Sequence, residues 1–184
     1  MGFHTFDVER AEALEDAGRY RFCSREELLG AIDPSADDVV ADVGSGTGFY
    51  TDEVAPFVER MYAVDVQPEM HEHYREKGAP ENVEFVTAGA TSLPLSDDEL
   101  DAAFSTMTYH EFADDAALEE LARVVRPGGR VVTLDWSRSG TGDDGPPMDE
   151  RFALGDAVDA FESAGFTTVR GETRKETFVH VCTR

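Results

Sequence analysis

The chain has 184 residues, the length of one domain or at most two small ones. Hydrophobic residues make up 41% and aromatic residues 10%, more than disordered chains usually contain, so a packed core is expected. The formal net charge of −23 argues against a nucleic-acid-binding surface and against binding to anionic membranes, because such a chain repels both.

The charged residues are unbalanced in kind as well as in number. The chain holds 39 acidic and 16 basic residues, and among the basic ones only Lys77 and Lys175 are lysine. Many carboxylates with so little lysine indicate adaptation to a salty cytoplasm, where a short Debye length weakens self-repulsion. The alternative is an ordinary acidic protein, and the scarcity of lysine favours salt adaptation.

The cysteines, the histidines and the N-terminal residues further limit the class of protein to which this chain can belong. Cys23 and Cys182 are too few for a disulfide framework. Since His71 and His73 lie two positions apart on a predicted helix, they point apart, and no metal site is expected. Residues 1–7 have neither a basic start nor an apolar run, and no stretch approaches membrane-spanning length. A soluble cytoplasmic protein is expected.

Strand and helix patterns alternate along the chain. The helical patterns cover residues 8–30 (with a second start at the Ser24–Glu27 capping box), 49–60, 68–77, 114–125 and 149–164. The apolar runs that predict strands cover residues 39–43, 61–66, 83–87, 100–106, 130–136, 166–170 and 176–181. Composition predicts a flexible loop at 137–147.

This alternation predicts a three-layer α/β domain. Strands separated by helices pair in parallel through right-handed crossovers, and the near-continuous apolar strands fit a sheet covered on both faces. The last two strands have only a short connection, so they are expected to pair antiparallel. We expect one domain over 1–184, with an N-terminal helical segment (1–35), a ligand-binding core (36–136) and a C-terminal helix and strand pair (137–184).

A glycine-rich turn is the motif that carries the chemistry. Gly44, Gly46 and Gly48 follow a predicted strand and open a helix, so the backbone can turn tightly and approach a ligand without a Cβ clash. Asp65 ends the next strand, where a carboxylate lies beside the turn and can accept both hydroxyls of a ribose. Together these features predict a site for an adenosine-containing ligand.

Two cofactor classes share this geometry. A dinucleotide site needs a small residue where this chain has Phe49, which disfavours a nicotinamide cofactor. The spacing instead resembles that of class I S-adenosylmethionine (SAM)-dependent methyltransferases, in their small-molecule, type 11-like branch. The resemblance covers roughly residues 36–136, in the ordered segments 40–48, 63–65, 93–95, 101–105 and 123–132.

The resemblance implies a Rossmann-like sandwich with a mostly parallel seven-stranded sheet and an antiparallel C-terminal strand. It also implies SAM as cofactor. The residues that match its site are Asp42 (loop and methionine amino group), Gly44, Ser45, Gly46 and Gly48 (methionine part), Asp65 (ribose), Val66 (adenine) and Ser105 (methionine part). Where the family usually has Gly-Asp-Ala, this chain has Ala88-Gly89-Ala90, so the carboxylate that accepts the adenine amino group is missing. Backbone groups of Gly89 and Ala90, or Asp97 or Asp98, are the expected substitutes.

The acceptor pocket is expected beyond the carboxyl ends of the strands. His110 follows the fourth predicted strand and is a candidate general base, although ordering of its loop by hydrogen bonds is the favoured alternative. Tyr109, Trp136 and Tyr20 are candidate pocket residues, and each has packing as its alternative. Ser105 has an ordinary strand-end hydroxyl as its alternative.

SAM-dependent methyl transfer to a small-molecule acceptor is therefore the leading hypothesis. A non-catalytic SAM-binding module or inactive partner subunit is the second, because the adenine carboxylate is missing and the C-terminal region is short. A nicotinamide-dependent oxidoreductase is the third. The acceptor and the oligomeric state are not indicated by any motif.

Overall fold

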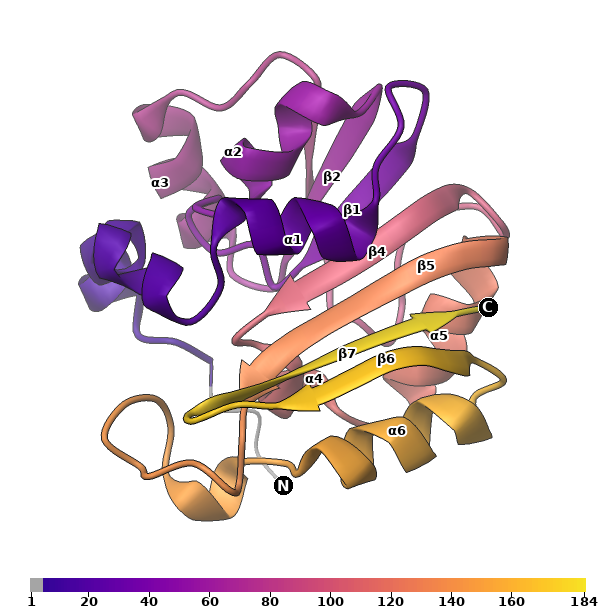
Figure 1. Cartoon of the computed structure of the whole chain (residues 1–184). Helices are drawn as coiled ribbons and strands as arrows, with labels where there is room; N and C mark the ends of the chain where they lie inside the picture. The colour runs from indigo at the N-terminus through magenta and orange to yellow at the C-terminus, as the bar shows by residue number, and fades with distance from the viewer. Residues whose placement is uncertain (1–4) are drawn as a thin grey trace.

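The computed structural model describes residues 5–184 and is built around one seven-stranded sheet in the order β3-β2-β1-β4-β5-β7-β6 (Figure 1). Every strand runs parallel to its neighbours except β7, which pairs antiparallel with both β5 and β6. The expected antiparallel C-terminal strand is confirmed. The strands are β1 (Val39–Val43), β2 (Arg60–Asp65), β3 (Val83–Thr87), β4 (Leu100–Thr106), β5 (Val125–Trp136), β6 (Thr167–Thr173) and β7 (Thr177–Thr183).

Helices cover both faces of the sheet, which confirms the expected three-layer Rossmann-like arrangement. On one face α1 (Arg25–Ile32), α2 (Thr51–Val54) and α3 (Pro68–Lys77) pack over β1, β2 and β4 and bury one apolar cluster. On the other face α4 (Tyr109–Phe112), α5 (Asp115–Val124) and α6 (Leu154–Ser163) bury a second cluster. Within residues 5–184, every helix is too short or too polar to cross a membrane.

Three of the predicted helices are shorter than their patterns suggest, and the one at 149–164 is reduced to a 3-10 turn (Met148–Glu150) and α6. Residues 8–30 form two 3-10 segments (Val8–Glu15 and Ala17–Arg21) before α1, whose N-terminus is capped by the Ser24 hydroxyl as expected. The predicted helix at 49–60 is reduced to α2 and a 3-10 turn (Ala55–Phe57), because Pro56 provides no backbone N–H to continue an α-helix.

Strand β5 is longer than predicted, because it begins at Val125 rather than at Arg130. Leu100 pairs with Val125 while Ala102 pairs with Arg130, so the segment between them, including Pro127 and Gly128, forms an irregularity in the strand pairing. A bulge of this kind lets a proline and a turn-forming glycine remain within a strand.

The parallel pairing decides where the candidate site lies. The carboxyl ends of β1, β2, β4 and β5 meet at one edge of the sheet, as neighbours in the strand order. The glycine turn, Asp65, α4 and Trp136 each follow or end one of these strands. Residues far apart in sequence are thereby brought to one crevice, as expected for open α/β sheets.

Tyr109 belongs to the apolar core rather than to a ligand pocket, which corrects the expectation from sequence. Its side chain is buried, and its ring packs edge-on against Phe112 and Phe178 and stacks on Phe161 with centroids 5.8 Å apart. As the first residue of α4, it fastens this short helix to the layer containing α6.

Replacing Tyr109 is therefore expected to change stability rather than ligand binding. Tyr109→Ala leaves a cavity among four phenylalanines (Phe112, Phe152, Phe161 and Phe178) and should lower the free energy of unfolding by about 3–5 kcal/mol. Tyr109→Phe keeps the ring and should remain within about 1 kcal/mol of the wild type. Chemical denaturation of both variants measures the difference. Equal stability of the Ala and Phe variants would contradict the packing role.

Candidate functional site

The glycine turn is fixed to the end of the neighbouring strand β2. The backbone N–H groups of Gly44 and Ser45 both donate to the Val64 carbonyl, at 2.8 and 2.9 Å. Gly44 has a φ of 82°, and a Cβ there would come within 2.3 Å of the Thr108 side chain. Only glycine satisfies both the left-handed backbone and this close approach.

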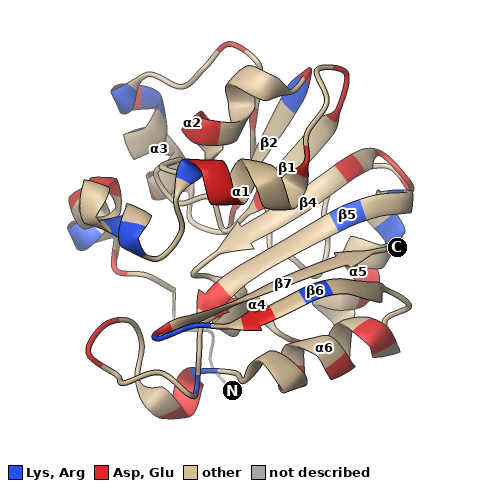
Figure 2. Ribbon diagram, in the orientation of Figure 1, with Lys and Arg blue, Asp and Glu red and all other residues tan. Residues whose placement is uncertain are grey.

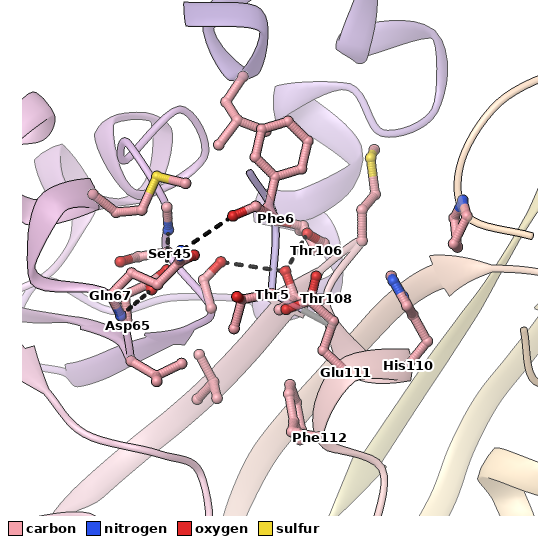
Figure 3. A pocket seen from close by; sticks show the side chains of 18 of the residues that line it. Thr5, Phe6, Ser45, Asp65, Gln67, Thr106, Thr108, His110, Glu111 and Phe112 are labelled. Carbon is pink, nitrogen blue, oxygen red and sulfur yellow. Dashed lines mark hydrogen bonds between the residues drawn. The ribbon is translucent and has the colours of Figure 1, made fainter. Parts of the chain in front are cut away.

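Asp65 joins the turn to β2 through its side chain. One carboxylate oxygen accepts a hydrogen bond from the Gly46 N–H at 2.8 Å, and the other accepts from the Gln67 N–H at 2.9 Å. Burial raises the pKa of Asp65, although both N–H donors lower it. Each oxygen keeps a lone pair for a further donor. Figure 3 shows Asp65, Gln67 and Ser45 gathered on one side of the pocket.

Asp42 lies beneath the turn, on β1, and is only 1% exposed. Its Oδ2 atom accepts a hydrogen bond from the Thr51 hydroxyl at 2.7 Å. Its Oδ1 atom is buried and has no partner within residues 5–184. Burial raises the pKa of Asp42 to about 7, against the opposing effects of the Thr51 hydrogen bond and of Arg19.

The cavity beside this turn has a volume of about 910 Å³, near the upper end of the range for ligand pockets. Of the residues expected to hold the cofactor, those that line the cavity are Gly44, Ser45, Gly46, Asp65, Val66, Gly89 and Ala90. The opposite end of the cavity is lined by His110 and Trp136. The structure thus brings most of the predicted site residues together.

Three predicted residues lie outside the cavity wall. At Gly48 an added Cβ would lie 2.1 Å from the Tyr74 ring, so this glycine lets the turn pack closely against α3 and does not line the cavity. Ser105 is buried and its neighbour Thr106 lines the cavity instead, since successive side chains of a strand point to opposite faces. Asp42 stands behind the turn.

Tyr20 is likewise not a pocket residue. Its hydroxyl donates a hydrogen bond to Glu53 at 2.5 Å, and its ring packs on Phe49 with centroids 4.8 Å apart. The N-terminal segment contributes other side chains to the cavity wall, which are Thr5, Phe6, Arg10, Ala13, Leu14, Asp16, Arg19 and Phe22. The segment therefore covers the cavity, but with residues other than Tyr20.

The two aspartates considered as substitutes for the missing adenine carboxylate do not line the cavity. Asp97 forms an ion pair with Arg123 at 2.7 Å, and Asp98 forms one with Arg184. That expectation is wrong, because both carboxylates are engaged by arginines outside the cavity wall. Gly89 and Ala90 line the cavity together with Thr91.

His110 is held by a buried carboxylate on the neighbouring strand. Asp135, which is 0% exposed, accepts the His110 backbone N–H at 2.8 Å and lies 2.9 Å from Nδ1. Because a carboxylate only accepts hydrogen bonds, Nδ1 carries the hydrogen, and Nε2 of the neutral ring keeps a lone pair. Burial lowers the pKa of His110, but Asp135 outweighs it, and the net pKa is raised.

Trp136 and the loop after β5 close the far end of the cavity. The Trp136 ring contacts Phe22 of the N-terminal segment with centroids 4.7 Å apart. The loop is held by Arg151, whose Nε donates to the Pro146 carbonyl at 2.9 Å, and by Glu176, whose carboxylate accepts the Thr141 N–H at 3.2 Å. Both ends of the loop predicted at 137–147 are thus anchored by buried charged side chains.

Several cavity residues were missed by sequence analysis. Glu111 follows His110 on α4, and Gln67 donates from Nε2 to the Phe6 carbonyl at 3.1 Å, which ties the N-terminal segment to the end of β2. Thr108 donates to the Gly44 carbonyl at 3.3 Å. These contacts join segments distant in sequence. Only the placement of Glu111 beside His110, after a predicted strand, offered a local signal.

Comparisons with known proteins agree with this geometry. A family model described as a methyltransferase domain matches residues 41–133. A SAM-dependent methyltransferase from Aquifex aeolicus has the same fold, with a TM-score of 0.88 and 30% identity over 97% of this chain and 98% of that one.

Two curated relatives match a smaller share of their own length. An uncharacterised methyltransferase-like protein of Schizosaccharomyces pombe is 31% identical over 74% of this chain and 54% of its own length. A demethylmenaquinone methyltransferase of Clavibacter sepedonicus is 35% identical over 58% of this chain and 44% of its own length. The chain spans about half the length of the curated relatives it matches. From the fold, the glycine turn with its aspartate and the extent of these matches, the chain belongs to the SAM-dependent methyltransferase family.

Proposed function

We propose that the protein transfers the methyl group of SAM to a small-molecule acceptor. The observation that carries the proposal is the glycine turn hydrogen-bonded to Asp65 at the mouth of a cavity of about 910 Å³. A turn and carboxylate in this relation suit a ligand with a ribose. The demethylmenaquinone methyltransferase relative is named for an acceptor that is a small molecule, which favours the same class here.

The residues of the turn fit SAM. Asp65 has lone pairs left for the ribose hydroxyls, and Gly44 to Gly46 expose backbone to the methionine part. The unpartnered buried Oδ1 of Asp42 lies behind the turn, where a water or the methionine amino group supplies its missing donor. Val66, Gly89 and Ala90 form the wall proposed for adenine, which here is held without a carboxylate.

When bound, SAM supplies an electrophilic methyl group, so the protein's main task is to hold the acceptor in line with it. His110 is the proposed general base for acceptors that lose a proton in the step. Asp135 orients its ring and fixes the tautomer that leaves Nε2 unprotonated. Trp136 and Phe22 exclude water from the acceptor side.

A SAM-binding module without transfer activity is the alternative. It is favoured by the engagement of Asp97 and Asp98 in ion pairs outside the cavity, which leaves adenine held by backbone and apolar contacts. Incubation with tritiated SAM and a metabolite extract separates the two, since only the enzyme transfers label to an acceptor.

The cytoplasm of a salt-adapted organism is the location that we propose from composition. Figure 2 shows acidic residues distributed over helices and loops around the fold. With a net charge of −23, self-repulsion at low salt opposes the folded state.

Removing the Asp65 carboxylate tests the cofactor site. Asp65→Ala is expected to weaken SAM binding by roughly 3 kcal/mol, about a hundredfold, because two hydrogen bonds to a charged group are lost. Asp37→Ala, at an exposed turn, is the matched control and should bind as the wild type does. Isothermal titration calorimetry measures both. Unchanged binding by Asp65→Ala would refute the site.

The pairing of His110 with Asp135 is expected to control its titration. In the wild type the His110 pKa lies above its ordinary value, so the base form accumulates as pH rises through that raised pKa. In Asp135→Asn the charge is lost and burial remains, so the pKa should fall below the ordinary value. NMR titration of the imidazole C–H signals, assigned with His110→Gln, measures both values; an unmoved pKa would contradict the pairing.

Salt adaptation predicts that thermal stability rises with KCl. The melting temperature should increase by several degrees between dilute buffer and molar KCl, as screening shortens the Debye length from about 30 Å at 0.01 M to about 3 Å at 1 M. Circular dichroism melts at several KCl concentrations measure it, with sucrose at matched osmolality as control. Equal melting temperatures in low and molar KCl would rule the adaptation out.

A further inference from the structure

The acceptor side of the cavity holds two carboxyl groups that have no ion-pair partner among the described residues. Glu111 and Glu150 both line it, and neither forms an ion pair or a side-chain hydrogen bond with any residue from 5 to 184. Every other carboxylate of the lining is engaged. Asp65 holds the glycine turn, Asp16 caps a 3-10 segment through the Gly18 N–H, and Asp144 pairs with Arg21 at 2.7 Å.

The two arginines of the lining, Arg10 and Arg19, form no ion pair with Glu111. Arg19 donates from Nη1 to the Leu14 carbonyl at 2.7 Å, and its guanidinium lies over the Phe49 and Tyr50 rings at 5.0 and 5.1 Å. Arg10 lies 5.7 Å from the Phe6 ring centroid. The carboxylate of Glu111 thus lines the cavity without an ion-pair partner among the described residues.

The surroundings of Glu111 favour the binding of a cation. Burial, together with the carboxylates of Asp65, Asp135 and Glu150, raises the pKa of Glu111 to about 7 against the opposing effect of His110. An unpaired carboxylate in such a place is costly to keep charged, and a bound cation removes that cost.

A second polar group points to a ligand at the same wall. The His110 side chain is only 9% exposed, and its Nε2 atom has no hydrogen-bond partner within residues 5–184. Figure 3 shows Glu111 and His110 projecting from α4 toward the cavity, with Phe112 beneath them. Trp136 and Phe22 add aromatic surface, which attracts cations as well as apolar groups.

We propose that the methyl acceptor is a small amine with an apolar body, whose ammonium group is bound by Glu111 beside Nε2 of His110. This inference rests on the proposed function. One ammonium proton passes to Nε2, and another N–H stays on the Glu111 carboxylate. The freed nitrogen lone pair then forms the N–C bond to the methyl group as the C–S electron pair returns to sulfur. The products are a protonated imidazole, the methylated ammonium ion and the demethylated cofactor.

Binding of a charged probe and its neutral analogue tests the proposal directly. Benzylamine and benzyl alcohol have the same ring, and at mildly alkaline pH the amine is protonated while Glu111 is ionised. Calorimetry on the full chain, with and without saturating S-adenosylhomocysteine (the demethylated cofactor), should show wild-type preference for benzylamine by tenfold or more, since a charged hydrogen bond contributes at least about 1.5 kcal/mol. The preference should shrink at acidic pH, where Glu111 is protonated.

Three variants test whether Glu111 causes the preference for benzylamine over benzyl alcohol. Glu111→Gln should reduce benzylamine affinity to that of benzyl alcohol, and Glu111→Asp, which keeps the charge, should retain part of the preference. Glu119→Gln on the exposed side of α5 makes the same charge change outside the cavity and should behave as the wild type does. Thermal melts establish that each variant is folded.

The outcomes separate failure of this inference from failure of the proposed function. Absence of a benzylamine preference in the wild type, or its persistence in Glu111→Gln, overturns the amine assignment. If Glu111→Gln instead weakens SAM but not S-adenosylhomocysteine and keeps the benzylamine preference, Glu111 faces the sulfonium, and the assignment is likewise overturned. Failure of the wild type to bind either cofactor form defeats the proposed function, while the titrations without cofactor still test the amine site.

Discussion

The attachment of the glycine turn to the end of β2 is the constraint on which the cavity depends. Two backbone N–H groups of the turn donate to Val64, and a third donates to Asp65. Because β1 and β2 are parallel neighbours, both strands deliver their next residues to the same edge of the sheet. The turn therefore exposes backbone to the cavity, and the carboxylate that fixes the turn is also the group proposed to bind a ribose.

Closure of the cavity depends on segments outside the central sheet. The N-terminal segment lies across the turn and is tied down by Gln67 at one end and by Lys77, whose ammonium bridges Glu15 and Asp52 at 3.1 and 2.9 Å. The loop after β5 is anchored by Arg151 and Glu176 and reaches the segment through the pair of Arg21 with Asp144. These are mostly polar contacts near the surface, each of modest strength, so the cover is weaker than the sheet that supports it.

The two ends of the cavity differ in whether their carboxylates have hydrogen-bond partners. At the end proposed for the cofactor the carboxylate of Asp65 accepts hydrogen bonds from backbone donors, whereas at the end proposed for the acceptor Glu111 has no partner among the described residues and His110 presents Nε2. Buried titratable groups with displaced pKa values are typical of functional sites, and here Asp42, Glu111 and His110 all belong to that class. The amine proposal follows from this contrast between a satisfied and an unsatisfied carboxylate.

Local patterns determined the strands, the glycine turn and Asp65, because apolar runs, glycines and a strand-end acid are signals carried by consecutive residues. They also predicted His110 and Trp136 at the carboxyl ends of the strands, where both line the cavity. The pocket assignments of Tyr20 and Tyr109 failed, since whether an aromatic ring faces a ligand or a core is decided by what packs against it. The pairing of Asp135 with His110 forms only when β4 and β5 meet in space, and the cover over the cavity forms only when the N-terminal residues reach the end of β2. The lack of a partner for Glu111 among the described residues is likewise a result of this assembly. No spacing along the sequence encodes contacts between residues so far apart.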